Sequence, residues 1–105
     1  SNILPPYDFW RSVSAPSRDR PLQLNDNQPF TVVQRIKING TFFPQVTYED
    51  KNELCEVSLK SKRGENSSEM ETKISVKNTL IKPEDYVKFR DMIVKWYSKF
   101  KLKED

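Results

Sequence analysis

Histidine is absent from this sequence, and cysteine and glycine nearly so, with one and two residues. Without histidine the chain lacks the commonest general base and the usual nucleophile–histidine pairs of hydrolases. One cysteine cannot form a disulfide within the chain or a zinc site built on paired thiolates. Two glycines leave no Gly-rich phosphate-binding loop. We therefore expect no enzyme activity from the chain by itself, and no bound metal or cofactor.

Strong net charge and long apolar runs are also missing. The 18 Lys and Arg residues face 15 Asp and Glu residues, and the resulting net charge of +3 predicts no nucleic-acid partner. No run approaches the roughly 18 apolar residues of a membrane span, so we expect no transmembrane segment in this chain. The opening residues show no signal-peptide pattern, and any targeting segment is expected outside this sequence.

The lone Cys55 lies between Leu54 and Val57 in an alternating stretch. A cysteine in that setting is expected to be a small buried residue and not a nucleophile. Three acidic pairs lack the ligand spacing of a calcium loop, so we expect them in solvated turns and at a helix N-terminus. They are Glu49-Asp50, Glu69/Glu71 and Glu84-Asp85.

The first 29 residues hold five of the seven prolines, which forbid a continuous helix and interrupt sheet ladders. Residues 1–29 are therefore predicted to be an extended lead-in or interdomain segment before a β-rich domain at 30–105. Tyr7, Phe9 and Trp10 are too apolar to stay in solvent, and we expect them either along the core or at an interface with a neighbouring domain. Leu22 and Leu24 predict a short edge strand.

Alternation of apolar and polar residues predicts the strands of the domain. It runs from Phe30 to Ile38, from Leu54 to Lys60, and from Met70 to Leu80. The dipeptide Asn39-Gly40 favours a tight hairpin, with residues 41–48 pairing back on the first of these strands. Residues 49–52 are expected to form an acidic turn, and residues 62–68 a solvated loop.

A helix is predicted over residues 83–100. Pro83 is acceptable at a helix start, and the acidic Glu84 and Asp85 complement the dipole of the first turn. Aromatic and aliphatic residues then recur at helical spacing on one side of the helix. They are Tyr86, Phe89, Ile93, Trp96 and Phe100, flanked by Met92 and Tyr97.

These elements predict a mainly β fold. We expect an antiparallel β-sandwich-like, immunoglobulin-like module with one C-terminal amphipathic helix. The alternative is an α+β sheet with the helix packed on one face. Short turns between consecutive strands exclude parallel βαβ units, which need a crossover.

Lysines beside the aromatic stripe leave a second use for the helix open. Residues 83–103 could bind an acidic partner, a membrane surface or nucleic acid as an autonomous module. We favour docking of the stripe on the chain's own sheet, because lysines near a helix C-terminus are favourable there in any case. The lysines are Lys88, Lys95, Lys99, Lys101 and Lys103, and a basic loop at residues 60–63 adds a weaker candidate site.

Two segments of the chain resemble a known family. Residues 18–38 and 81–97 are similar to the C-terminal domain of unknown function that follows transglutaminase-like, papain-type domains in cell-envelope proteins of Bacteroidetes-type bacteria. The middle of the chain does not match. The matching positions are Arg18, Pro21, Leu22, Phe30, Pro83, Tyr86, Phe89 and Arg90.

The resemblance implies a non-catalytic accessory domain of a larger secreted protein, located in the periplasm or cell envelope. Its partners would be other domains of the same polypeptide, including an upstream catalytic domain that it packs on or orients. No residue of the catalytic triad can be carried over to this chain. We expect Tyr7, Phe9 and Trp10 to make the contact with that neighbour.

Overall fold

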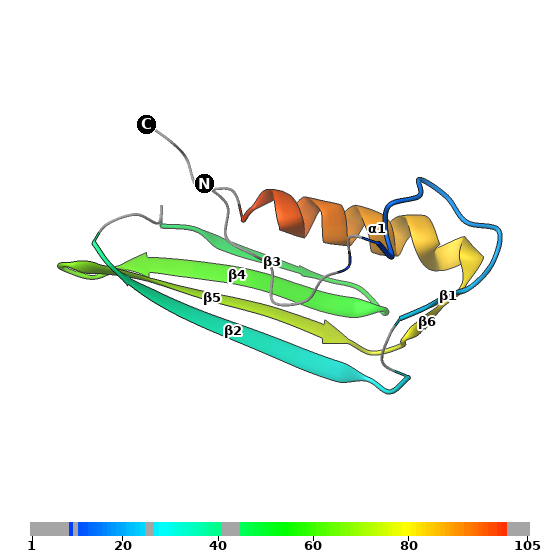
Figure 1. Cartoon of the computed structure of the whole chain (residues 1–105), viewed down its shortest axis with the longest axis horizontal. Helices are drawn as coiled ribbons and strands as arrows, with labels where there is room; N and C mark the ends of the chain where they lie inside the picture. Colours follow the sequence, from blue (N-terminus) through cyan, green and yellow to red (C-terminus); the bar gives the residue numbers. More distant parts are fainter. Residues whose placement is uncertain (1–8, 10, 25–26, 41–44, 101–105) are drawn as a thin grey trace.

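The computed structural model describes residues 9, 11–24, 27–40 and 45–100, which form strands and one C-terminal helix (Figure 1). The mainly antiparallel β fold with a single C-terminal helix agrees with the prediction from the sequence. In chain order the elements are β1 (Leu22–Gln23), β2 (Phe30–Asn39), β3 (Thr47–Lys51), β4 (Cys55–Arg63), β5 (Ser67–Val76), β6 (Leu80–Ile81) and α1 (Pro83–Ser98).

The strands form a four-stranded sheet with the order β2-β5-β4-β3 and a two-stranded sheet of β1 and β6, all antiparallel. Strands β3, β4 and β5 follow one another as neighbours, and β2 lies beside β5, which is a Greek-key order. Helix α1 lies along one face of the four-stranded sheet, above β3 and β4, and β2 lies at the edge away from it (Figure 1). The opposite face of the sheet carries mostly polar side chains.

The predicted hairpin after β2 is wrong. Gly40 does adopt a positive φ of 117°, but β2 pairs over its whole length with β5, and β3 lies at the other edge of the sheet. Residues 41–44 fall outside the described part of the chain. Pairing with β5 sets Val32 opposite Ile74 and Ile36 opposite Met70, so ten residues of matching alternation outweigh the preference of a two-residue turn.

Two segments predicted as turn and loop are instead largely strand. Strand β3 continues to Lys51 through the supposed acidic turn, and only residues 64–66 separate β4 from β5. In the other direction, β5 ends at Val76 and not at Leu80. Polar runs such as these can form strands because every second side chain lies on the solvated face. There Lys60 pairs with Glu49 (2.8 Å), and Lys62 with Glu69 (3.3 Å).

The core lies between the four-stranded sheet and a second layer made by α1, the lead-in and the small sheet. The whole predicted stripe of α1 is buried, together with Phe100 just beyond the helix end, so it docks on the chain's own sheet. The largest fully buried side chains are Trp96, Tyr86, Phe9, Phe89, Leu24, Leu59, Ile74, Ile81, Ile93, Val13 and Val57.

Helix α1 begins at Pro83 with Glu84 and Asp85 in its first turn, as predicted, and ends at Ser98. The Lys99 and Phe100 N–H groups bond to the carbonyls of Trp96 and Tyr97, so a tighter turn closes the helix. No helix in the described part of the chain is long and apolar enough to cross a membrane.

The lead-in is part of the fold. Strand β1 pairs with β6, which sets Leu22 opposite Ile81 directly before the helix. Val13, Leu22 and Leu24 are buried in the same core as the helix stripe. Of the two positions that the sequence left open for this segment, the described residues therefore lie along the core of their own domain.

Candidate interaction surfaces

Phe9 packs inside the domain. Its ring has no exposed surface and meets Phe89 of α1 edge-on, with ring centroids 5.6 Å apart. Its N–H donates to the Tyr97 hydroxyl at 2.6 Å. In this structure Phe9 therefore serves its own core, which revises its predicted role as a contact to another domain. Tyr7 and Trp10 lie outside the described residues, and their role stays a prediction.

Three further contacts bind the lead-in to α1. The Tyr86 hydroxyl donates to the Ala15 carbonyl at 2.5 Å, and Arg90 Nε donates to the Val13 carbonyl at 3.0 Å. The Arg18 guanidinium lies over the Tyr86 ring, 5.8 Å from its centroid. Tyr86 is buried and Arg90 is half-buried, so their positions are fixed by the core. Their contacts therefore hold the lead-in on a defined path across the helix.

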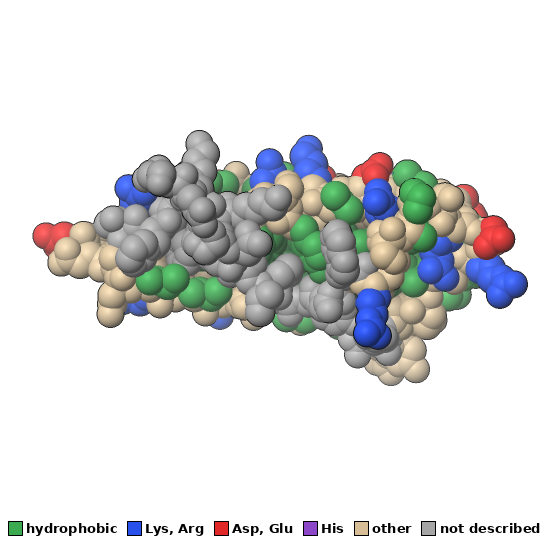
Figure 2. Space-filling view, turned by 45° about the horizontal axis from the view of Figure 1, so that its top comes forward, with side chains coloured by type: hydrophobic (Ala, Val, Ile, Leu, Met, Phe, Trp, Pro, Cys, Tyr) green, Lys and Arg blue, Asp and Glu red, His purple; other side chains and the backbone are tan. Residues whose placement is uncertain are grey.

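Lys88 of α1 and Lys99 just after it have separate partners. Lys88 forms an ion pair with Glu53, and the Lys99 ammonium lies 5.1 Å from the centroid of the Tyr48 ring. Figure 2 shows Lys and Arg side chains spread singly over this side of the molecule, with acidic ones among them. Lys101 and Lys103 are outside the described residues. An aromatic and basic helix surface would require the buried stripe of α1 to leave the sheet.

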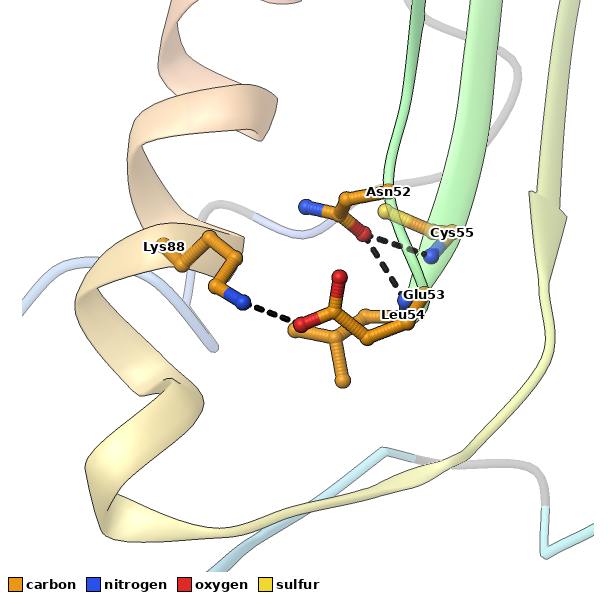
Figure 3. A network of polar contacts seen from close by, with 5 residues as sticks. All are labelled: Asn52, Glu53, Leu54, Cys55 and Lys88. Atoms are coloured by element: carbon orange, nitrogen blue, oxygen red, sulfur yellow. Dashed lines mark hydrogen bonds and ion pairs between the residues drawn. The ribbon is translucent and has the colours of Figure 1, made fainter.

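A polar corner joins the start of β4 to the helix (Figure 3). The Asn52 side-chain oxygen accepts hydrogen bonds from the N–H groups of Leu54 (2.8 Å) and Cys55 (3.0 Å). The backbone N–H of Asn52 donates to the Cys55 carbonyl at 3.0 Å. Beside it, the hydrogen bond from Lys88 lowers the pKa of the Glu53 carboxyl. Asn52 therefore shapes the turn that leads from β3 into the buried strand β4.

Replacing Asn52 with alanine is expected to lower the free energy of unfolding by about 1–2 kcal/mol, because two N–H groups lose their acceptor. Asn78→Ala is the matched control, since the Asn78 side chain accepts one exposed bond, from Leu80 N–H at 3.1 Å. That variant should lose less than half as much. Urea unfolding followed by circular dichroism measures both. Equal losses would contradict the role assigned to Asn52.

Cys55 is fully buried, as the sequence predicts, and its thiol donates to the Met92 sulfur at 3.2 Å. Burial, and then the nearby charge of Asp50, raise the pKa of the thiol to about 12. The thiolate is the reactive form of cysteine, and here it is suppressed. Cys55 is thus placed as a small core residue.

The raised pKa of Cys55 predicts a loss of stability in alkali. The unfolded chain releases this proton near its ordinary pKa of 9.0, whereas the folded chain keeps it up to about 12. Between these values the unfolded state binds fewer protons, so stability falls as pH rises, by at most about 1.4 kcal/mol per pH unit. Chemical unfolding at pH 8 and pH 10 should show this fall for the native chain and a smaller one for Cys55→Ala. Identical falls would contradict it.

A hollow of about 700 Å³ lies against β2, β5 and β4. Three adjacent cross-strand rows line it: two rows of outward, charged side chains, and between them the inward row of Ile36, Met70 and Ser61. Cations from β2 and β4 flank anions from β5, and Arg35 pairs with Glu71 at 2.8 Å. The charged lining residues are Arg35, Lys37, Lys60, Lys62, Glu69 and Glu71.

The acidic pairs of the sequence are divided between the charged outer face, the inner side of β3, where Asp50 lies, and the helix start. Glu49, Glu69 and Glu71 each pair with a cation of a neighbouring strand, and Glu84 and Asp85 lie in the first turn of α1. Within the described residues no group of three or more His, Cys, Asp or Glu side chains could hold a metal ion. Exposed pairs of this kind contribute little to stability, and their main effect is solubility.

The sequence did not predict the hollow or the exposed edge of β2. Alternation identified the outward positions on β2, β4 and β5, but the strand order decides which of them become neighbours. A comparison with models of known families, with curated proteins and with solved structures found no match for this chain. The resemblance of residues 18–38 and 81–97 to the transglutaminase-associated domain therefore stays a proposal.

Proposed function

We propose that this chain is a non-catalytic accessory module of a larger secreted, transglutaminase-like or protease-like protein, which packs on or orients the catalytic domain. The observation that carries the proposal is the path of the lead-in across α1. Phe9, Val13 and Ala15 are each hydrogen-bonded to a side chain of the helix. From Phe9 onward, the segment that would connect to a preceding domain is anchored to the helix.

The chemistry of the chain supports an accessory role. The sequence contains no histidine, and its one thiol is sealed in the core with its pKa raised to about 12. Neither a nucleophile–histidine pair nor an activated cysteine can form from these groups. In the proposed protein the reaction is carried out by the neighbouring domain, and this module contributes position.

The two segments of the family resemblance meet in space, which also supports the proposal. Arg18, from the first segment, lies over the ring of Tyr86, from the second. Arg18 also donates to the Pro21 carbonyl at 3.3 Å, directly before β1. Strand β1 then pairs with β6, which leads into the helix. Positions from both segments thus come together although residues 39–80 separate the segments in the sequence.

The size and cell fraction of the native protein test the proposal. An antibody raised against this domain should detect, in the source cells, a band several times larger than 12.4 kDa in the envelope fraction. A band near 12.4 kDa in the cytosol would overturn the proposal and favour a free-standing module that binds through the cations of the helix. Binding of that kind should weaken steeply with salt, unlike an apolar contact between domains.

A further inference from the structure

Strand β2 is a long edge strand with an incompletely covered apolar side. Among the described residues it has a neighbour only at β5, over all ten residues from Phe30 to Asn39. Its inner side chains Val32, Ile36 and Ile38 are half-buried, whereas the inner side chains of β5 are fully buried. Helix α1 lies over the other half of the sheet (Figure 1). Among the described residues, the apolar layer therefore continues to the β2 edge and ends there.

The opposite edge, at β3, carries the features that prevent strand pairing. It has only five residues, Thr47–Lys51, and it turns the charged Asp50 toward the inner face. Short edges and inward charges are common devices against edge-to-edge association. Strand β2 has neither feature, because it is ten residues long and its two charges, Arg35 and Lys37, both point to the outer face. No proline interrupts it either.

The sequence of β2 is self-complementary about Gln34. The inner residues on either side of Gln34 are apolar at distances of two and four positions. In an antiparallel pairing of two copies centred there, Val32 faces Ile36 of the second copy, and Phe30 faces its Ile38. On the outer face, Val33 meets Arg35 and Thr31 meets Lys37, so no two cations are opposed.

Other registers are less favourable. A shift that centres the pairing on Arg35 places the two Arg35 side chains opposite each other, and like charges in that position are destabilising. A shift that centres it on Val33 sets Gln34 against Val32 and leaves Lys37 and Ile38 without partners. A slip of one residue brings inner positions of one copy against outer positions of the other. The pattern thus selects the register centred on Gln34.

We propose that a second copy of this chain pairs antiparallel with β2 in this register and forms a two-fold symmetric dimer. The two four-stranded sheets become one continuous sheet of eight strands. The two-fold axis runs through Gln34 perpendicular to the sheet, so both helices lie on the same side. The half-buried apolar row of β2 is then covered by the same row of the partner. The dimer does not depend on the proposed accessory role.

Cross-linking at the symmetry axis tests the register. In Gln34→Cys the two new thiols lie directly opposite each other, within the range that a disulfide spans. Thr31→Cys, on the same strand, places its thiols about 20 Å apart, because six residues separate them along the partner strand. The native Cys55 is fully buried and gives little background.

Mild oxidation should convert Gln34→Cys, but not Thr31→Cys, into a species of twice 12.4 kDa. Circular dichroism of each reduced variant confirms that it is folded. Cross-linking of Gln34→Cys that is no faster than that of Thr31→Cys would overturn the proposal. A native chain that stays monomeric in sedimentation at about 1 mM, where even a weak interface associates, would overturn it as well.

Charge variants at Val33 give a second, independent readout. Val33 is 41% exposed, so either substitution leaves the core intact, and in the proposed register it faces Arg35 of the partner twice per dimer. Val33→Glu should tighten dimerisation by about fivefold and Val33→Lys should weaken it by about fivefold. Val87→Glu and Val87→Lys, at a position 48% exposed on α1, are the controls and should not change it. Equal dissociation constants for both Val33 variants would contradict the register.

Discussion

Trp96→Ala should lower the free energy of unfolding by about 3–5 kcal/mol, the largest effect we expect from a single substitution in this chain. The Trp96 ring has no exposed surface, packs edge-on against Phe100 at 5.1 Å, and donates its indole N–H to the Ser58 carbonyl at 3.0 Å. Alanine removes this packing and the hydrogen bond to the Ser58 carbonyl. The free energy of unfolding of a domain is about 5–15 kcal/mol in total, so this variant would lose much of its stability.

Urea unfolding monitored by circular dichroism measures the loss. Trp96→Phe keeps most of the apolar volume and loses only the N–H, and it should cost about 1–3 kcal/mol. Val94→Ala, on the solvent side of the same helix with 37% exposure, controls for helix propensity and should stay within about 1 kcal/mol of the native chain. If Trp96→Ala were no more harmful than Val94→Ala, the helix would not be docked on this sheet.

Phe9→Ala should destabilise the domain by about 3–4 kcal/mol, because Phe9 fills the core beside Phe89 although it belongs to the proline-rich lead-in. Hydrogen exchange at Val13 is a more local measurement. Its N–H bonds to the Phe9 carbonyl at 3.0 Å, and it should lose protection before the amides of β4 and β5 do. That order would show that the lead-in detaches first.

Ser14→Ala is the control for the Phe9 variant. The Ser14 hydroxyl makes one exposed local bond, to the Arg11 carbonyl at 3.1 Å, and its loss should change stability by less than about 0.5 kcal/mol. A Phe9→Ala variant as stable as Ser14→Ala would show that the lead-in is an attached tail and would remove the support for a fixed path toward a neighbouring domain.

Periodicity predicted the elements whose side chains face the core. The stripe of α1 was identified residue by residue, and so were the inner positions of β2 and β5. Burial of Cys55 followed from its alternating neighbours. These predictions succeeded because an element with one buried face needs apolar side chains at its own period, about 3.6 residues for a helix and two for a strand.

Strand partners could not be predicted in the same way. The dipeptide Asn39-Gly40 favours a hairpin, and Gly40 does take up a positive φ, yet β2 pairs with β5. Composition also failed at Glu49 and Asp50, which lie in β3 although they look like a turn. On a sheet with one solvated face, a polar run is compatible with either a strand or a loop, and only its neighbours decide between them.

For the interaction surfaces too, the sequence predicted which residues are apolar, and only the fold decided what they contact. The sequence marked Phe9 as too apolar for solvent but could not tell a core position from an interface, since both bury an aromatic ring equally well. The exposed edge of β2 had a visible signal, the symmetric pattern about Gln34. That pattern acquires meaning only once β2 is known to lie at the edge of the sheet.

By itself the sequence determined the fold class, the helix and its buried stripe, the inner side of β2, β4 and β5, and the lack of histidine-based chemistry. Each of these depends on residues close together in the chain or on composition alone. Only the tertiary structure decided the strand order, the place of the lead-in against α1, and which strand is left at the edge. These depend on contacts between distant residues, such as Phe9 with Phe89 and Val32 with Ile74, whose matching surfaces no local pattern encodes.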